Sequence, residues 1–114
     1  MRAFIRVMKA LSDTNRVKII KMLGTKELCV CEITAILGLA QSTVSRHLKI
    51  LEDADLIISS RNGTWVNYKL LDNFENQYAE TMQRYLKGWL DEEPQIQEAL
   101  SQVSTVDRQR IYAA

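Results

Sequence analysis

The most informative stretch of the chain is QSTVSRHLKIL, residues 41 to 51, in which apolar residues recur at helical spacing. At about 100° per residue, Val44, Leu48 and Leu51 fall on one side of a helix. The opposite side carries hydroxyl and basic side chains, namely Ser42, Ser45, Arg46 and Lys49. Such side chains can contact phosphates and base edges in a DNA groove, although an ordinary solvent-exposed helix face has the same composition. The neighbouring elements decide between these two interpretations.

Two helices are predicted at the start of the chain. Residues 2 to 11 form the first, and its apolar stripe consists of Phe4, Met8 and Leu11. Residues 14 to 23 form the second, which Ser12 or Asp13 can cap and Gly24 ends. We expect its inward-facing side chains to be Val17, Ile20 and Leu23.

A third, shorter helix is predicted over Cys29 to Leu37, and Gly38 and Leu39 supply a turn into the helix at residue 41. Its buried row is expected to be Val30, Ile33 and Leu37. Two short helices joined by a tight turn containing Gly, with a polar face exposed on the second helix, are typical of a helix-turn-helix.

A β-hairpin is predicted directly after this motif. Leu56 to Arg61 and Thr64 to Leu70 are rich in β-branched and aromatic residues, and Asn62-Gly63 between them is a strong signal for a type I′ turn. Pairing across that turn would set Arg61 opposite Thr64 near the tip, within reach of a phosphate or a minor groove. A hairpin in this position is a wing, so the pattern predicts a winged helix-turn-helix.

Helical spacing returns at Phe74 and continues through Tyr78, Met82, Tyr85 and Trp89 until Pro94 stops the helix. These side chains could form part of the core, but so many large apolar residues on one face favour a subunit interface. We expect the interface to comprise Phe4, Met8, Tyr78, Met82, Tyr85 and Trp89. Residues 95 to 103 could add one short helix. We therefore predict a DNA-binding and dimerisation domain over residues 1–93 and a C-terminal extension with a loosely held tail over residues 94–114.

Charge is distributed unevenly along this single-domain chain of 114 residues. Residues 1–51 contain nine Lys and Arg against three Asp and Glu, whereas residues 52–114 contain six against eleven. The basic half holds the stretch at residue 41, which suggests a polyanionic partner for it. No apolar run reaches membrane-spanning length and no signal peptide is evident, so we expect a cytoplasmic protein. One histidine and no Gly-rich phosphate loop argue against an enzyme, and no catalytic cofactor is expected.

The run ELCVCEITAILGLAQSTVSRHLKILEDADLI, followed by RNGTWVNYKL and preceded by KALSDTNRVKIIKML, resembles the ArsR family of winged-helix repressors, which sense arsenicals and metals in bacteria. The resemblance covers Met8 to Leu71 closely. It implies a homodimer that binds a pseudo-palindromic operator in double-stranded DNA and is released by an inducer. His47 suits either a DNA contact or a packed ring. The DNA-binding residues expected from the resemblance, the exposed helix face and the wing are Gln41, Ser42, Thr43, Ser45, Arg46, His47, Lys49 and Arg61.

The two cysteines, Cys29 and Cys31, resemble the arsenic site of that family, which implies trivalent arsenic or antimony as the inducer. The family's third cysteine corresponds to Thr34, so the third ligand position goes to an external thiol, to water or to nothing. Thiol oxidation or another thiophilic metal is the alternative signal. Two small cysteines that merely fill space at a helix start are the structural alternative.

The spacing of the cysteines also suggests a mechanism. Residues two apart on an α-helix point about 200° from each other, so Cys29 and Cys31 could not both bind one ion while that turn is regular. Binding would then have to unwind or bend the turn. We expect the distortion to pass through Ile33, Leu37 and Gly38 to the helix at residues 41 to 51, the recognition helix of the motif, and to weaken its fit to DNA.

Overall fold

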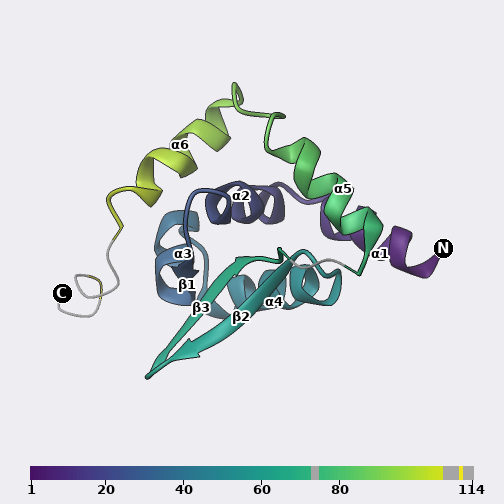
Figure 1. The fold of residues 1–114 in the computed structure, drawn as a ribbon. Helices are drawn as coiled ribbons and strands as arrows, with labels where there is room; N and C mark the ends of the chain where they lie inside the picture. The colour runs from purple at the N-terminus through teal and green to yellow at the C-terminus, as the bar shows by residue number, and fades with distance from the viewer. Residues whose placement is uncertain (73–74, 107–110, 112–114) are drawn as a thin grey trace.

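A computed structural model describes residues 1–72, 75–106 and 111 of the chain (Figure 1). It is mostly helical with a β-hairpin, as predicted, and a third short antiparallel strand, which was not predicted, joins the hairpin. In chain order the elements are α1 (Arg2–Ala10), α2 (Thr14–Leu23), β1 (Leu28–Cys29), α3 (Val30–Leu37), α4 (Gln41–Asp53), β2 (Ile57–Asn62), β3 (Trp65–Leu70), α5 (Gln77–Leu86) and α6 (Pro94–Val103).

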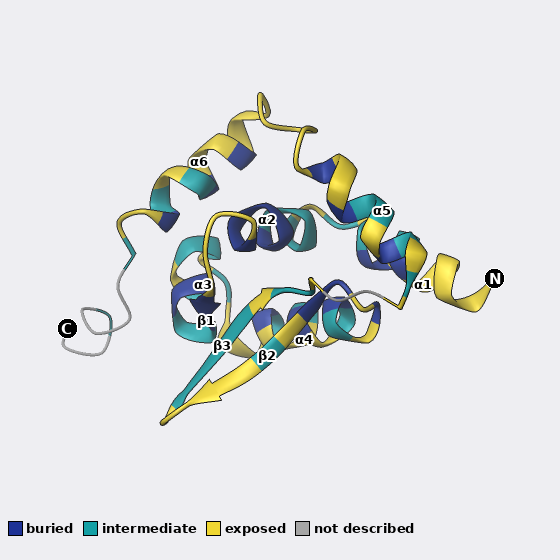
Figure 2. Ribbon diagram, viewed as in Figure 1, coloured by how far each residue is buried: buried dark blue, intermediate teal, exposed yellow. Residues whose placement is uncertain are grey.

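The helix α2 is the centre of the fold. In Figure 1, α3 and α4 lie below it and α5 and α6 arch over it. Because α2 is covered from several sides, Ile19 and Met22 are fully buried in addition to the predicted inward residues Ile20 and Leu23 (Figure 2). Val17, the third predicted inward residue, is only half-buried. The predicted bounds of this helix are confirmed, and the Asp13 side chain caps it by accepting a hydrogen bond from the Arg16 backbone N–H.

The helix-turn-helix consists of α3 and α4. Gly38 ends α3 with a φ of 67°, a left-handed conformation that glycine adopts without strain. The predicted inner face of α4 is confirmed, since Val44, Leu48 and Leu51 are fully buried. The strand order β1-β3-β2 places the hairpin of β2 and β3 beside α4, and the hairpin extends away from the helices (Figure 1).

The hairpin forms as predicted, but its register was predicted wrongly. Asn62 pairs with Trp65 and Arg61 pairs with Val66, so Gly63 and Thr64 are the turn residues and Arg61 is not opposite Thr64. Gly63 has a φ of 65°, whereas Asn62 keeps the negative φ of a strand residue. Glycine at the first central position is the type II′ arrangement, which needs only one positive φ. The side chain of Asn62 is therefore spared the left-handed conformation.

The end of α5 was also predicted wrongly. The helix ends at Leu86, and Pro94 begins α6 instead of stopping α5. Trp89 therefore lies beyond α5, while Phe74, the first residue of the predicted stripe, lies outside the described residues. The predicted short helix over residues 95–103 is confirmed as α6, which contacts α2 and α3.

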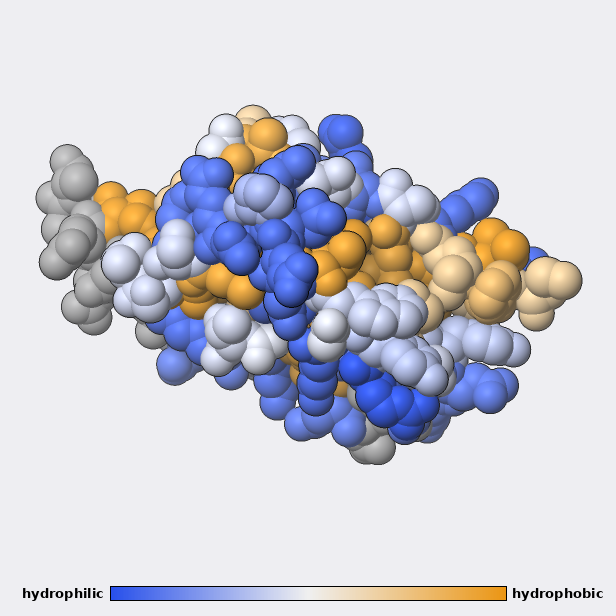
Figure 3. All heavy atoms as spheres, turned by 90° about the horizontal axis from the view of Figure 1, so that it is seen from above, coloured by the Kyte–Doolittle hydropathy of each residue, from blue (hydrophilic) through white to orange (hydrophobic). Residues whose placement is uncertain are grey.

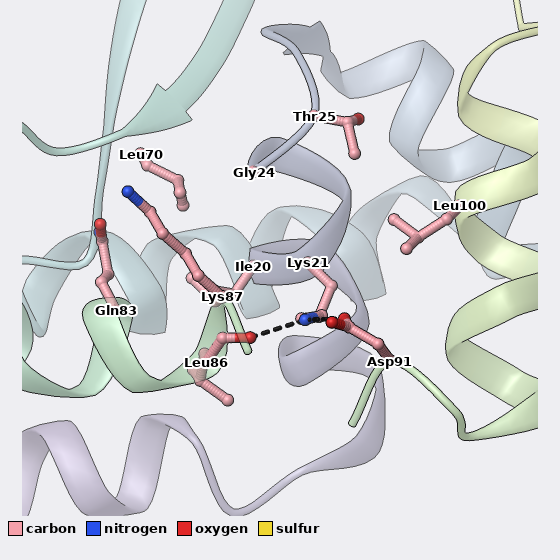
Figure 4. Close-up of a pocket in the computed structure, with 10 residues that line it drawn as sticks. All are labelled: Ile20, Lys21, Gly24, Thr25, Leu70, Gln83, Leu86, Lys87, Asp91 and Leu100. Atoms are coloured by element: carbon pink, nitrogen blue, oxygen red, sulfur yellow. Dashed lines mark hydrogen bonds and ion pairs between the residues drawn. The ribbon is translucent and has the colours of Figure 1, made fainter. Parts of the chain in front are cut away.

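A buried lysine from α2 holds the end of α5 in place (Figure 4). The Lys21 Nζ donates to the carbonyl oxygens of Leu86, at 2.6 Å, and Trp89, at 2.8 Å, and to the Asp91 carboxylate, at 2.5 Å. The Lys21 side chain is only 7% exposed. The contact with Leu86 is to a carbonyl at the helix end, and the contacts with Trp89 and Asp91 hold the segment that follows α5.

The predicted stripe of α1 lies at the edge of the core, where Met8 and Leu11 pack against it and Phe4 remains exposed. Val7 and Ala10 are the buried residues of this helix, whereas Phe4 is 40% exposed and Met8 and Leu11 are half-buried. Within the described part of the chain, no helix combines the length and the apolar character needed to cross a membrane.

Candidate nucleic-acid interface and dithiol site

The outward face of α4 carries polar side chains on a firmly packed helix. Ser42, Ser45, Arg46 and Lys49 are exposed, as the helical pattern predicts, and so is Gln41 at the first helical position. Thr43 and His47 are half-buried. Because the opposite side of α4 is locked in the core, these polar residues have a fixed orientation and could enter a groove together.

Two of the predicted DNA-binding residues already have partners within the protein. Lys49 forms an ion pair of 3.0 Å with Asp53 one turn later, and both side chains are well exposed. The Asp53 carboxylate, by its hydrogen bond and its charge, raises the pKa of Lys49, which therefore remains a cation. The Nδ1 atom of His47 accepts a hydrogen bond of 3.1 Å from Arg16, which also donates to the Ala10 carbonyl at 2.8 Å. His47 therefore connects α4 to the start of α2.

The wing lies beside this helix. Arg61 is exposed near the end of β2, and Ser59 on the same strand donates a hydrogen bond of 3.1 Å to Glu52 of α4. The wing and α4 are therefore directly connected, and Figure 1 shows the hairpin of β2 and β3 running past α4.

The two thiols do not have the geometry expected from the sequence. Cys29 is the last residue of β1 and the N-cap of α3, with a φ of −86° and a ψ of 165°, so it is extended and not helical. Only Cys31 belongs to the helix. The angular argument for two helical residues therefore does not apply, and the thiols of Cys29 and Cys31 hydrogen-bond to each other in the folded protein. No unwinding is needed to bring them together.

A capping box sets this geometry. The backbone N–H of Cys29 donates a hydrogen bond of 2.8 Å to the carboxylate of Glu32, and the Glu32 backbone N–H in turn points to the Cys29 sulfur. Burial, and next the hydrogen bond with Cys31, raise the pKa of Cys29 to about 12. Cys29 is thus a buried, protonated thiol at neutral pH, 1% exposed, whereas Cys31 is half-buried.

The dithiol opens into a cavity of about 140 Å³. Besides the residues around the start of α3, the cavity is lined by Gln41 of α4, the recognition helix, and by residues at the tip of the wing. The lining residues are Cys29, Val30, Cys31, Gln41, Thr64, Trp65 and Val66. A ligand held by the thiols would therefore touch both elements of the candidate DNA interface.

Thr34, at the position of the missing third cysteine, has a buried hydroxyl. Of the buried side-chain oxygens and nitrogens in the described residues, the Thr34 Oγ1 is the one without a hydrogen-bond partner. In those same residues no cluster of three or more His, Cys, Asp and Glu side chains could hold a metal ion. Thr34 does not line the cavity of the two thiols, so the site offers two sulfur ligands, which suits a thiophilic centre with two sulfur ligands better than a three-thiolate centre.

The predicted interface residues of α1 and α5 adjoin one another on the surface. The rings of Phe4 and Tyr78 meet edge to face at 5.4 Å between centroids, and those of Tyr85 and Trp89 stack at 5.2 Å. Tyr85 and Trp89 are each 50% exposed, and Met8, Tyr78 and Met82 are half-buried. In the view from above, apolar atoms gather on the right-hand side, over α5 and α1 (Figure 3).

Sequence reasoning missed Glu32, Arg16 and the wall residues of the cavity. Glu32 could have been found, since Cys29-x-x-Glu32 has the spacing of a capping box that places Cys29 before the helix. Arg16 and the wall residues Trp65 and Val66 carry no such local signal, because their partners are far away in the sequence.

The profile of the arsR family of bacterial regulatory proteins matches residues 13–59. The arsenical resistance operon repressor of Bacillus subtilis (strain 168) is 42% identical over 77 residues, which are 67% of this chain and 73% of that protein. The chain belongs to the ArsR family. The repressor of the same name from Escherichia coli (strain K12) is 37% identical, and the match spans 58% of this chain and 57% of that family member.

The fold of this ArsR-family chain is similar to solved structures. The homodimeric winged helix-turn-helix DNA-binding domain Mb0332 of Mycobacterium bovis matches with a TM-score of 0.66 and 26% identity, over 80% of this chain and 81% of that one. The predicted winged helix-turn-helix is therefore confirmed.

Proposed function

We propose that this chain is a transcriptional repressor that binds a palindromic operator as a homodimer and releases it when trivalent arsenic or antimony binds Cys29 and Cys31. The observation that carries the proposal is the cavity in which the two thiols face Gln41 and the wing. A thiophilic inducer held there would contact α4 and the wing, which carry the proposed DNA contacts. The names of the Bacillus subtilis and Escherichia coli relatives support arsenical resistance as the setting.

For DNA binding, the proposed contacts are the exposed residues of α4 and Arg61 of the wing. A duplex carrying the DNA upstream of the chain's own gene serves as the probe, with binding followed by fluorescence anisotropy over a range of salt concentrations. Arg46→Ala should weaken binding and lower the salt slope by about 1 if Arg46 neutralises one phosphate. Lys87→Ala is the matched control, because Lys87 is an exposed cation after α5 that takes no part in the proposed contacts.

For dimerisation, the exposed aromatic residues on and next to α1 and α5 form a surface that could pack against the same surface of a second copy of the chain. Mb0332 is a homodimer by its description, which supports the same assembly here. Trp89→Asp should yield monomers in sedimentation velocity and bind the duplex weakly. Ile58→Asp, at an exposed apolar position on the wing, should remain dimeric. A monomeric parent protein that still binds the duplex tightly would refute the homodimer.

For induction, each thiol is removed singly. Cys29→Ser and Cys31→Ser should bind the duplex like the parent protein and should no longer release it on addition of arsenite. Release that survives both substitutions would exclude the dithiol as the sensor. Titration with antimonite, cadmium, zinc and peroxide in parallel identifies the signal. Release by peroxide alone would support the alternative of thiol oxidation, and release by cadmium or zinc alone would support another thiophilic metal.

A further inference from the structure

The guanidinium group of Arg16 joins three segments of the chain. Its Nε donates to the Ala10 carbonyl at 2.8 Å and its Nη2 to the Lys9 carbonyl at 3.3 Å, so the end of α1 fixes the orientation of the group. The backbone N–H of Arg16 is held by the Asp13 side chain at the start of α2, at 3.1 Å. The remaining nitrogen, Nη1, lies 3.1 Å from Nδ1 of His47 on α4. Because the guanidinium is planar and rigid, its contacts with α1 also fix its approach to the histidine ring.

The contact with Arg16 determines which ring nitrogen of His47 carries the proton. A guanidinium group has five N–H donors, no acceptor, and a charge that it does not lose in proteins. The Nδ1 atom of His47 must therefore accept, so it carries no proton. A neutral imidazole has one N–H group, which in this ring is then at Nε2. Arg16 thus makes the far edge of the His47 ring a hydrogen-bond donor.

The Nε2–H group of His47 is available to a partner outside the protein. In the ranges that the structure describes, the Nε2 atom has no hydrogen-bond partner. It also remains open to solvent, because in those ranges the Thr34 Oγ1 is the one unpaired side-chain nitrogen or oxygen that is shut off from it. His47 is half-buried at the border of the polar face of α4, directly after the exposed Arg46. A donor at this border can reach DNA that the polar face contacts.

We propose that Arg16 is a positioning residue for DNA recognition, which holds His47 as an Nε2–H donor so that it pairs with a hydrogen-bond acceptor of the operator. The proposal rests on the DNA binding proposed above and specifies the kind of DNA atom that this side chain recognises. The available acceptors are a phosphate oxygen and, in the major groove, purine N7, guanine O6 and thymine O4. The amino groups of adenine and cytosine are excluded, because the ring offers them no acceptor.

The advantage of this arrangement is that the ring is set before DNA arrives. A histidine without a fixed partner presents either a donor or an acceptor, and binding would have to select one of the two forms. Arg16 makes that selection in the free protein. Since Arg16 is itself held by carbonyls of α1, a helix outside the helix-turn-helix contributes to the chemistry of the DNA-reading face.

The first measurement is the tautomer of His47 in the free protein. His47 is the one histidine of the chain, so both ring signals of a protein labelled with 15N-histidine belong to it. At about pH 8.5, where an ordinary histidine ring is neutral, the parent protein should show a protonated Nε2 and an unprotonated Nδ1. Arg16→Met should show a mixture of the two tautomers. Lys18→Met, which removes a cation from the same helix, should keep the parent spectrum. A protonated Nδ1 in the parent protein would overturn the inference.

The second measurement separates the two edges of the ring with amide side chains. His47→Gln places an N–H donor near the position of Nε2, whereas His47→Asn keeps an acceptor near the position of Nδ1 and has no donor at the far edge. In the anisotropy assay, the Gln variant should bind the duplex within about threefold of the parent protein. The Asn variant should bind about five- to tenfold more weakly, the effect of one hydrogen bond. Equal affinities, or tighter binding by the Asn variant, would contradict the proposal.

A double-mutant cycle shows whether Arg16 acts through His47. Arg16→Met should weaken duplex binding about three- to fivefold, if the released ring adopts the donor arrangement about a fifth to a third of the time. The salt slope should stay unchanged, because no phosphate contact is lost. In the His47→Ala background, Arg16→Met should have no further effect on affinity. An equal loss in both backgrounds, or a lower salt slope, would mean that Arg16 contacts DNA by itself. If Arg16→Met does not fold, the parent spectrum and the Gln and Asn variants decide the question.

Modified duplexes identify the acceptor. Methylphosphonate linkages each remove a charged phosphate oxygen, and base analogues such as 7-deazaguanine each remove one acceptor from the major groove. The modification that weakens binding by the parent protein but not by His47→Ala marks the partner of Nε2. If every modification affects both proteins equally, the inference fails while duplex binding stands. A parent protein that binds no duplex would overturn the proposed function, whereas the spectrum of the free protein tests the role of Arg16 without DNA.

Discussion

Lys21 and Cys29 are both buried side chains that can ionise, but their surroundings differ. The Lys21 ammonium donates to two carbonyl oxygens and a carboxylate, so all three of its N–H groups have partners. At the dithiol, Cys29 is held as a neutral thiol, and the nearby Thr34 hydroxyl has no partner. The first region is complete within the protein and has a structural role. The second leaves one buried polar group, the Thr34 hydroxyl, without a hydrogen-bond partner.

The largest expected effect of a substitution that tests this contrast is at Lys21. Lys21→Met retains the apolar stem and removes all three donated hydrogen bonds. We expect a loss of about 2–3 kcal/mol in the free energy of unfolding, because the carbonyls of Leu86 and Trp89 and the Asp91 carboxylate lose a charged donor. Urea unfolding at fixed protein concentration measures it. Lys18→Met on the same helix is the control, and an equal loss there would show that the cluster has no special role.

The next effect concerns pH. Burial and the Cys31 hydrogen bond raise the pKa of Cys29 from 9.0 in the unfolded chain to about 12 in the folded protein. The stabilisation is therefore complete below pH 9 and is lost as the pH rises toward 12. The urea midpoint should fall more steeply between about pH 9 and pH 11 in the parent protein than in Cys29→Ser, which has no thiol to ionise. Parallel curves would mean that Cys29 ionises equally in both states.

A smaller effect is expected at Thr34. Thr34→Val retains the shape of the side chain and removes the unpaired hydroxyl, so it should stabilise the protein by about 1 kcal/mol. Thr34→Ser retains the hydroxyl and loses the methyl group, so it should destabilise. Urea unfolding of both variants decides the question. A destabilised Val variant would show that the hydroxyl has a partner in solution.

The smallest effect is expected at Asp91. Its side chain is 55% exposed, so water replaces most of what Lys21 provides. Asp91→Asn should cost less than about 1 kcal/mol in the same unfolding measurement. A loss as large as that of Lys21→Met would mean that the carboxylate, and not the two carbonyls, is the main partner of the ammonium.

The sequence predicts the elements that depend on neighbouring residues and misses those that depend on distant ones. Elements with local signals were found, including α2 from Asp13 and Gly24, α4 from its apolar spacing, and the wing from Asn62-Gly63. The hairpin register was wrong because one Gly serves two turn types equally well. The contacts that hold the segment after α5 could not be predicted, since they come from Lys21, whose hydrogen-bond partners lie 65 to 70 residues further along the chain.

The candidate site was predicted by residue type but not by geometry. Cys29 and Cys31 were identified, yet assigning Cys29 to a helix led to an unwinding step that the structure does not require. The cavity could not be foreseen, because three separate segments of the chain meet only in the folded protein to form it.

The packing of α6 has a consequence for how the protein is made. Ala99 and Val103 of this last described helix share one core with Val7 of the first helix and Val44 of the recognition helix. On the ribosome, residues 94–103 emerge after all the other helices described here. The core is therefore completed only when α6 has left the exit tunnel, and a nascent chain stalled before Pro94 would expose apolar parts of α2 and α3 to chaperones.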